Sequence, residues 1–235
     1  VNESSERVVM ALKELDGPRA EPASGGPAKS LVIFLHGLGA DGNDLIGLAP
    51  LLSQVLPDTA FVSPNAPEPC DMAPSGYQWF SLQDRSYGQV LSGVQAAAPQ
   101  LEAFIAREAE HYGLSLGSVA LVGFSQGTMM SLYVAPRLAE TVAGVVGYSG
   151  ALVAPERLAQ EIKVRPPVLL IHGDADPVVP PAALTAATQA LLSMQFKVMS
   201  DLRSGLGHSI DEEGLSLGAA FLRQVLVEGG LPEKT

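Results

Sequence analysis

The sequence predicts a single α/β domain with a mostly parallel central sheet and helices on both of its faces. Its 235 residues are 47% hydrophobic and 17% charged, which is enough to bury one sizeable core. Short, continuous apolar runs such as Leu31–Leu35 are typical of strands buried on both faces of a parallel sheet. These runs alternate with segments of helical periodicity, as in a parallel sheet covered on both sides. We therefore expect residues 1–235 to form one domain.

The expected elements follow this alternation along the chain. Residues 1–16 fit an edge strand better than a helix, and residues 17–30 form a loop rich in proline and glycine. The apolar runs predict strands at 31–35, 59–63, 119–124, 143–148, 168–171 and 196–201. The helical periodicity predicts helices at 43–55, 88–111, 126–136, 182–194 and from about 211, with one short helix between 151 and 166.

Capping residues and prolines mark the expected helix ends. Asn43 is suited to cap the helix after the first buried strand, and Pro50 is expected to bend or restart that helix. Pro99 is expected to break or kink the long helix that follows. Ser209 and Glu212 have the spacing of a capping box at the start of the last helix.

Residues 64–88 are the one long irregular segment that the sequence predicts. The segment combines several prolines with aromatic and methionine side chains. Long irregular segments in compact domains are often binding loops. We therefore expect Met72, Trp79 and Phe80 to contact the substrate, although ordinary packing of the loop explains each of them equally well.

Charge and composition exclude several classes of function. The net charge of −11 argues against nucleic acid or an anionic membrane surface as the main partner. The N-terminal stretch does not resemble a signal peptide, and the single cysteine, Cys70, fits a reducing compartment, so we expect a cytoplasmic protein. The uncharged run 112–136 contains several glycines and serines, which favours a buried strand and helix over an integral membrane span.

The most informative motif is Gly123-Phe-Ser-Gln-Gly127, which lies between an expected strand and an expected helix. This is the nucleophile-elbow pattern, in which glycines on both sides of the serine allow a turn too tight for larger side chains. Ser125 at the apex is then the candidate nucleophile, and a surface serine in an ordinary glycine-rich turn is the alternative. Ser149 is a weaker candidate because its motif lacks the second glycine and the following helix.

A serine nucleophile needs a histidine base and a third group that orients the base. His208 alone follows the last expected strand, in a glycine-rich turn that can present an imidazole. Asp174 and Asp176 both follow the strand 168–171, and we prefer Asp176 because it lies one step deeper in the loop. Ser125, Asp176 and His208 then occur in the order nucleophile, acid, histidine. The remaining histidines have less suitable positions: His36, His111 and His172.

Gly37-Leu-Gly-Ala-Asp-Gly42 is a literal G-x-G-x-x-G sequence after a strand, as in dinucleotide-binding folds. That use needs an acid at the end of the next strand, whereas Asp58 precedes its strand and Glu68 is wedged between prolines. A glycine-rich turn after an early strand also leaves backbone N–H groups free to face an anion, as in the oxyanion site of hydrolases with a nucleophile elbow. We favour this second interpretation.

Four motifs in this order resemble the phospholipase/carboxylesterase family, which includes bacterial carboxylesterases and acyl-protein thioesterases. The motifs are His36–Gly42, Gly123–Gly127, His172–Pro180 and Gly207-His208, and the match spans roughly residues 30–225. The resemblance implies an α/β-hydrolase fold without a large cap domain, and frequently a homodimer. It also implies hydrolysis of carboxylic esters and thioesters.

The resemblance also implies roles for individual residues. It implies Ser125, Asp176 and His208 as the catalytic triad, with the backbone N–H groups of Leu38 and Gln126 as the oxyanion hole. The histidines show no paired ligand spacing and the chain has no C-x-x-C motif, so we expect neither a metal nor a cofactor.

Small to medium acyl esters are the expected substrates. Residues 151–166 between two expected strands leave no room for a multi-helix lid, so the site is expected to be shallow and roofed only by residues 64–88. An acyl-protein thioesterase or a lysophospholipase is the alternative within enzymes. A non-catalytic binding protein on a hydrolase fold is the alternative of another class.

Overall fold

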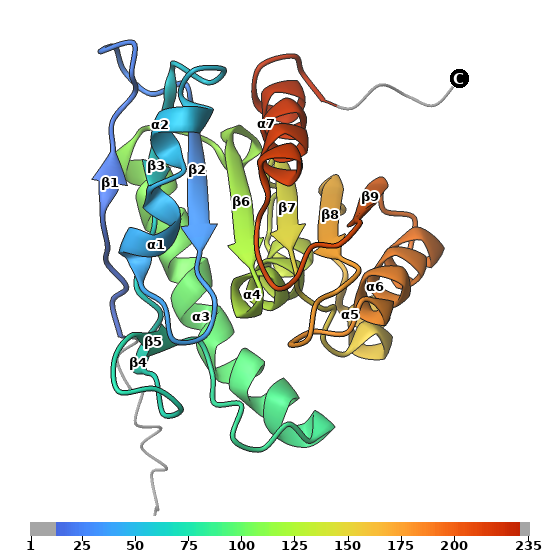
Figure 1. Cartoon of the computed structure of the whole chain (residues 1–235). Coiled ribbons are helices and arrows are strands. Elements are labelled where there is room, and N and C mark those ends of the chain that lie inside the picture. The colour runs from blue at the N-terminus through green and yellow to red at the C-terminus, as the bar shows by residue number, and fades with distance from the viewer. Residues whose placement is uncertain (1–12, 231–235) are drawn as a thin grey trace, which may run out of the picture.

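The computed structural model describes residues 13–230, which form a seven-stranded sheet covered by helices (Figure 1). The strand order is β1-β3-β2-β6-β7-β8-β9, and all neighbours are parallel except β1 with β3. The strands are β1 (Arg19–Ala20), β2 (Ser30–Leu35), β3 (Thr59–Val62), β6 (Val119–Phe124), β7 (Gly144–Tyr148), β8 (Val168–Gly173) and β9 (Val198–Arg203). The mostly parallel sheet agrees with the prediction and brings the carboxyl ends of six strands to one edge.

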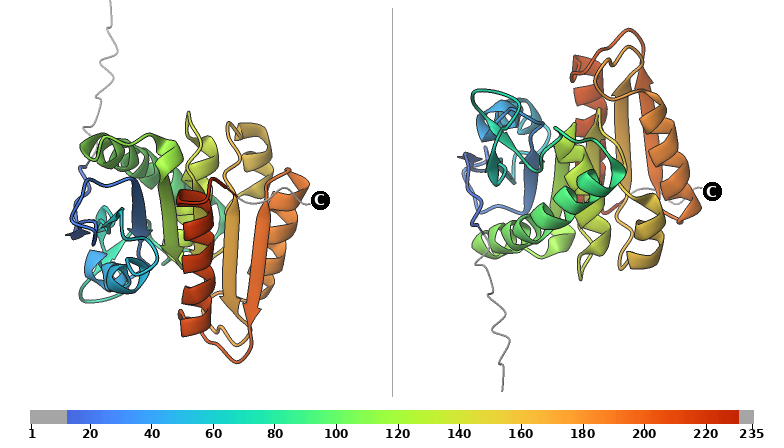
Figure 2. Two further views of the ribbon diagram at one scale, coloured as in Figure 1. Left: turned by 90° about the horizontal axis from the view of Figure 1, so that it is seen from above. Right: turned by 90° about the horizontal axis from the view of Figure 1, so that it is seen from below.

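Helices cover both faces of this sheet (Figure 2). One hydrophobic core lies between the sheet and α3, α4, α5 and α6, and a second core lies under α1, α2 and α7. The helices are α1 (Gly42–Ile46), α2 (Ala49–Leu52), α3 (Tyr87–His111), α4 (Gln126–Val134), α5 (Pro155–Glu161), α6 (Ala182–Ser193) and α7 (Glu212–Leu226), with short 3₁₀ turns η1 (Leu116–Ser118) and η2 (Ala135–Arg137). Because both faces are covered, the central strands are apolar along their whole length.

The irregular segment 64–88 contains a small hairpin of its own. Its strands are β4 (Glu68–Pro69) and β5 (Tyr77–Gln78), which pair antiparallel. The hairpin lies beyond the carboxyl edge of the main sheet, at the bottom of Figure 1. The segment is therefore more ordered than the proline-rich sequence predicted.

Two helix caps differ from the sequence prediction. Asp41 rather than Asn43 caps α1, and its carboxylate accepts the Asn43 N–H. Asp211 caps α7 and accepts the Gly214 N–H at 2.7 Å, so the predicted capping box of Ser209 is not formed. In both helices an aspartate two residues away from the predicted cap accepts the free N–H of the first turn.

The two helix prolines have different consequences. Pro50 lies in the first turn of α2, where a missing N–H costs nothing, so the helix restarts there as predicted. Pro99 lies within α3, which runs unbroken over 25 residues. Of the two predicted effects of Pro99, a break does not occur, because packing of a long apolar stripe against the core outweighs one lost hydrogen bond.

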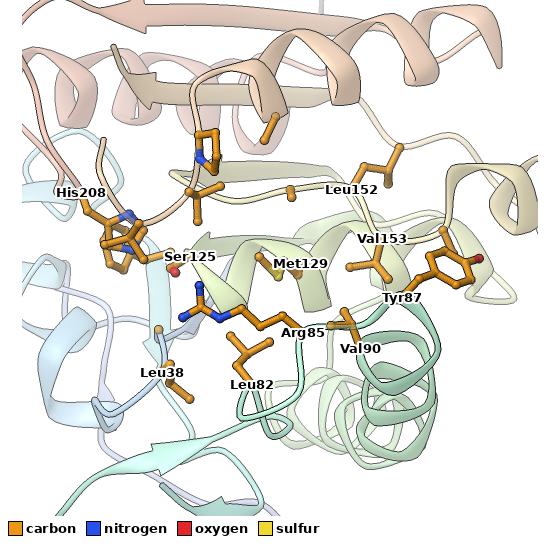
Figure 3. Close-up of a pocket in the computed structure, with 18 of the residues that line it drawn as sticks. Leu38, Leu82, Arg85, Tyr87, Val90, Ser125, Met129, Leu152, Val153 and His208 are labelled. Carbon is orange, nitrogen blue, oxygen red and sulfur yellow. The ribbon is translucent and has the colours of Figure 1, made fainter. Parts of the chain in front are cut away.

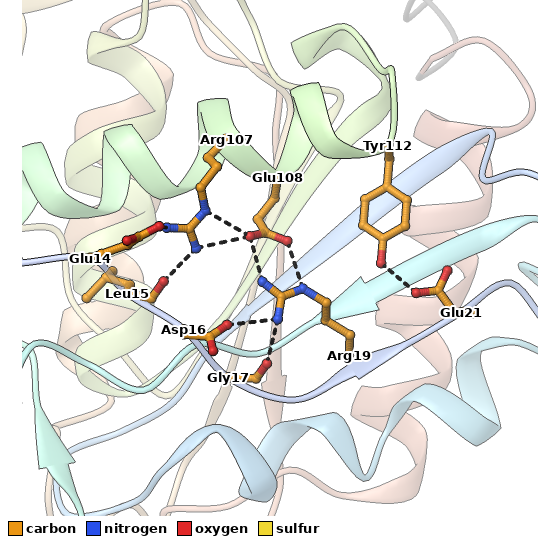
Figure 4. A network of polar contacts seen from close by, with 9 residues as sticks. All are labelled: Glu14, Leu15, Asp16, Gly17, Arg19, Glu21, Arg107, Glu108 and Tyr112. Atoms are coloured by element: carbon orange, nitrogen blue, oxygen red, sulfur yellow. Dashed lines mark hydrogen bonds and ion pairs between the residues drawn. The ribbon is translucent and has the colours of Figure 1, made fainter.

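The N-terminal segment is tied to α3 by a buried carboxylate (Figure 4). Glu108 of α3 accepts hydrogen bonds from Arg19 and Arg107, and only 1% of its surface is exposed. Arg107 in turn donates to the Leu15 carbonyl, and Arg19 pairs with Asp16. These contacts hold residues 15–19 against the domain, so that β1 forms an edge strand within the predicted loop 17–30.

The edge strand predicted within residues 1–16 falls largely on residues 1–12, outside the described part of the chain. Among residues 13–230, no helix has the length and apolar character needed to cross a bilayer.

Candidate functional site

Ser125 occupies a sharp turn between β6 and α4. Its backbone has φ 54° and ψ −114°, a strained conformation for a residue with a side chain. A Cβ on Gly123 would lie 2.5 Å from the Gly127 backbone, and a Cβ on Gly127 would lie 1.8 Å from the Leu35 carbonyl oxygen. Both glycines are therefore required by close backbone approach, as the motif predicted.

Asp176 and His208 are brought together from two different loops. Asp176 follows β8 and His208 follows β9, and the Asp176 Oδ2 to His208 Nδ1 distance is 2.7 Å. An Nδ1–H that donates to this carboxylate leaves Nε2 as the acceptor on the other side of the ring. The His208 ring also packs on Phe124, the residue before Ser125, with 4.9 Å between ring centroids.

The Asp176 carboxylate is buried and held by several donors. Its Oδ1 accepts the backbone N–H groups of Val178 and Val179 at 2.8 and 2.9 Å. Its Oδ2 accepts His208 and lies 3.3 Å from Nε2 of a second histidine, His172. Burial opposes ionisation, but the hydrogen bonds from His208 and the two amides outweigh it and hold the pKa of Asp176 below its usual value. Asp176 is therefore ionised at neutral pH.

Asp174 has a different position from Asp176. Its carboxylate is exposed and accepts the Gly205 N–H at 2.7 Å. The Ala175 N–H donates to the Leu206 carbonyl, and a Cβ on Gly173 would lie 2.0 Å from that same oxygen. The two loops are thus joined closely along their backbones, which fixes His208 relative to Asp176.

The glycine-rich loop after β2 approaches Ser125. Leu38 lines the same pocket as Ser125, and Leu38 N–H makes no hydrogen bond within the described part of the chain. Gln126 is the first residue of α4, so its N–H has no partner within that helix. At the start of the loop His36 is buried, and its Nε2 accepts the Ala66 N–H at 3.0 Å. Burial lowers the pKa of His36, so this ring is neutral and structural.

A pocket of about 710 Å³ opens beside Ser125 and His208 (Figure 3). Its wall is mainly apolar and is drawn from the end of the segment before α3, from the start of α3, from α4 and from the connections after β7 and β8. The apolar wall includes Leu82, Val90, Met129, Leu152, Val153, Pro155, Val178 and Pro180. Three ionisable groups besides the phenol of Tyr87 also line it: Asp44, Arg85 and His208.

The structure corrects the prediction for Met72, Trp79 and Phe80, because none of them lines this pocket. Trp79 and Phe80 are buried in the core, with exposed fractions of 1% and 4%, and Met72 is exposed elsewhere on the hairpin. The contribution of the segment 64–88 to the pocket comes instead from its end, through Leu82, Arg85 and Tyr87. Arg85 is the only lysine or arginine in that segment, but this alone does not indicate that it lines the pocket.

Gln126 holds the same segment through its side chain. Its Oε1 accepts the Trp79 N–H at 2.8 Å, and its Nε2 donates to the Phe80 carbonyl at 2.7 Å. The Gln126 side chain therefore has a structural role that the sequence did not reveal.

Among residues 13–230 there is no group of three or more His, Cys, Asp or Glu side chains that could hold a metal ion.

Comparison with known proteins identifies the family. The family model described as Phospholipase/Carboxylesterase matches residues 21–226. The chain belongs to the phospholipase/carboxylesterase family. The motif resemblance seen in the sequence is thereby confirmed, and the α/β-hydrolase fold agrees with it.

Relatives within the phospholipase/carboxylesterase family include esterases and thioesterases. Esterase YpfH of Escherichia coli is 30% identical over 85% of this chain and 84% of its own length. Acyl-protein thioesterase 1 of Saccharomyces cerevisiae is 33% identical over 85% of this chain and 94% of its own. The crystal structure of esterase PE8 superimposes with a TM-score of 0.87 at 44% identity, covering 91% of this chain and all of that one.

Proposed function

We propose that this protein is a serine carboxylesterase that cleaves small to medium acyl esters. The observation that carries the proposal is the short contact between Asp176 and His208, whose ring lines a mainly apolar pocket together with Ser125. The family of the chain supports the same chemistry, since relatives in it are named esterases.

In the proposed mechanism, the Ser125 hydroxyl attacks the ester carbonyl while His208 Nε2 takes its proton. Asp176 keeps the ring oriented and stabilises the imidazolium that forms. The N–H groups of Leu38 and Gln126 bind the oxyanion, and one such donor typically contributes about 10²–10³ in rate. His208 then protonates the departing alcohol, and water hydrolyses the acyl-enzyme with His208 as base.

The pocket supports a substrate of limited size. A volume of about 710 Å³ lies in the range of small-molecule sites, and its apolar wall suits a hydrocarbon acyl group. The connection from β7 to β8 contributes only the seven-residue helix α5, so no large cap covers the opening. Short and medium acyl chains are therefore the preferred substrates.

Active-site labelling and two matched aspartate variants test the triad. We expect a fluorophosphonate probe to label the parent protein and not Ser125→Ala. Asp176→Asn should lower kcat by about 10⁴-fold, because the amide favours the wrong tautomer of His208. Asp174→Asn should cost much less, because an amide oxygen can still accept the Gly205 N–H. Equal labelling of Ser125→Ala, or the reverse order of the two aspartate variants, would refute the assignment.

Thioester hydrolysis is the second candidate, because several relatives are named acyl-protein thioesterases. The same serine chemistry acts on both ester types. Measuring kcat/KM on short-chain esters, long-chain lysolipids and acylated peptides separates the two activities: a preference for acylated peptides would replace the carboxylesterase assignment. A homodimer and a cytoplasmic location stay predictions, and light scattering at micromolar concentration tests the first.

A further inference from the structure

Arg85 stands apart from the other arginines of the structure. Within residues 13–230 it makes no hydrogen bond or ion pair, although it lines the substrate pocket. Each of the other seven arginines in this range donates to a carboxylate or a backbone carbonyl: Arg19, Arg107, Arg137, Arg157, Arg165, Arg203 and Arg223. The guanidinium of Arg85 therefore keeps all of its donors available for a ligand.

The surroundings of Arg85 place this cation near the reacting bond. Figure 3 shows its side chain reaching across the pocket toward Ser125, beside Leu82. The neighbouring carboxylate of Asp84 accepts the Ser86 N–H at 2.8 Å instead of pairing with the guanidinium. Asp44 is the one carboxylate among the residues that line the pocket, and it forms no ion pair with Arg85. The pocket thus combines an apolar wall with an unneutralised guanidinium.

We propose that Arg85 binds a carboxylate of the substrate, so that the preferred esters carry an apolar chain and a carboxylate a few bonds from the scissile carbonyl. The planar guanidinium presents paired N–H donors that match a carboxylate in a bidentate geometry. The proposal rests on the hydrolase function proposed above and specifies its substrate class.

The charge of the whole molecule makes a local contact necessary. With a net charge of −11, the protein repels anions at long range, so a preference for an anionic ester must come from within the pocket. At 0.1 M salt, the repulsion between the protein and an anionic ester is screened beyond roughly 10 Å. An attractive contact between two exposed charges also weakens as salt is added. Asp44 disfavours a carboxylate on its side of the pocket, which directs the anionic group toward Arg85.

Two pairs of matched substrates test the proposal and locate the carboxylate. On the acyl side, para-nitrophenyl hydrogen adipate is compared with the neutral para-nitrophenyl adipamate. On the alcohol side, meta-carboxyphenyl butyrate is compared with meta-carbamoylphenyl butyrate. The readout is the ratio of kcat/KM for the anionic ester to that for its neutral amide analogue, with Ser125→Ala as the blank for spontaneous hydrolysis.

We expect Arg85→Gln to lower this ratio by about fivefold or more in at least one pair at low salt. The variant removes a charge-assisted hydrogen bond to the substrate carboxylate, and solvent partly screens that bond. Arg85→Glu should lower it further, and added salt should shrink the ratio of the parent protein. Arg223→Gln removes the same charge from α7, on a helix that does not line this pocket, and should leave the ratio unchanged.

The pair that responds identifies the side of the ester that carries the carboxylate. An equal ratio in the parent and Arg85→Gln for both pairs would overturn the proposal, as would an equal loss with Arg223→Gln. Failure of the hydrolase function itself has a different signature, because the parent would then hydrolyse the neutral esters no faster than Ser125→Ala.

Discussion

His172 is the residue near the candidate triad whose role the motif left open. It is buried, with 1% of its surface exposed, and its Nε2 lies 2.9 Å from the Val179 carbonyl and 3.3 Å from Asp176 Oδ2. Val179 also donates its N–H to the same carboxylate. His172 thus supports both Asp176 and the turn that holds it, which makes it a positioning residue.

Replacing His172 tests this role. We expect His172→Leu to lower kcat by about ten- to a hundredfold with little change in KM, because small displacements of a catalytic group reduce the rate strongly. His172→Gln keeps a donor and should recover part of the loss. Steady-state kinetics with a thermal melt for each variant separates this effect from unfolding. Unchanged kcat in a folded His172→Leu variant would show that the contact has no positioning role.

At the scale of elements, α4 connects the nucleophile turn to the segment 64–88. The Gln126 side chain makes two buried hydrogen bonds to the backbone of Trp79 and Phe80, while its own N–H, at the start of α4, has no partner among residues 13–230. Trp79 Nε1 also donates to the His36 carbonyl at 3.1 Å. The loop over the site is therefore anchored at Trp79 and Phe80 rather than closing as a free lid.

Removal of the Gln126 side chain measures how much this anchor contributes to the free energy of unfolding. Gln126→Ala leaves two buried backbone groups unpaired, so we expect the free energy of unfolding to fall by about 2–3 kcal/mol. The backbone N–H is retained, so Ser125 should still react with a fluorophosphonate. Gln83→Ala removes an exposed amide from the same segment and should cost less than about 0.5 kcal/mol. Urea denaturation compares the two, and equal stabilities would contradict the role of Gln126.

The sequence predicted the nucleophile turn better than the pocket wall. A Cβ on Gly123 would meet the Gly127 backbone and one on Gly127 would meet Leu35 of β2, and the short motif records both requirements as glycines. Trp79 and Phe80 were misassigned because an aromatic side chain in an irregular segment has no periodicity to tell burial from exposure. The position of Arg85 in the pocket depends on the course of the whole segment, so no local pattern could reveal it.

At the scale of the molecule, the N-terminal segment is attached to α3 by polar contacts. The Glu108 carboxylate accepts hydrogen bonds from two arginines, and the nearby Tyr112 hydroxyl donates to Glu21 at 3.1 Å (Figure 4). Burial, together with the hydrogen bond to Glu21, raises the pKa of Tyr112 to about 12. This attachment is therefore sensitive to alkaline pH.

Tyr112→Phe tests the alkaline sensitivity. An unfolded tyrosine ionises near pH 10, so between about pH 10 and 12 the unfolded chain loses the proton that the folded chain retains. The stabilisation is complete below about pH 10 and is lost as pH rises through about 12. We expect the free energy of unfolding to fall less steeply with pH in Tyr112→Phe than in the parent. Buried Tyr148 contributes equally to both proteins, so identical slopes would refute the assignment to Tyr112.

The connection between β7 and β8 shapes the pocket without carrying any of the proposed triad. Residues 151–155 form part of the pocket wall, and they lead into a helix of only seven residues before the chain returns to the sheet. Loops of this kind accept insertions far more readily than buried strands do. Lengthening it is therefore a direct route by which selection, or a protein engineer, could add a roof and change the accepted acyl chain while Ser125, Asp176 and His208 stay in place.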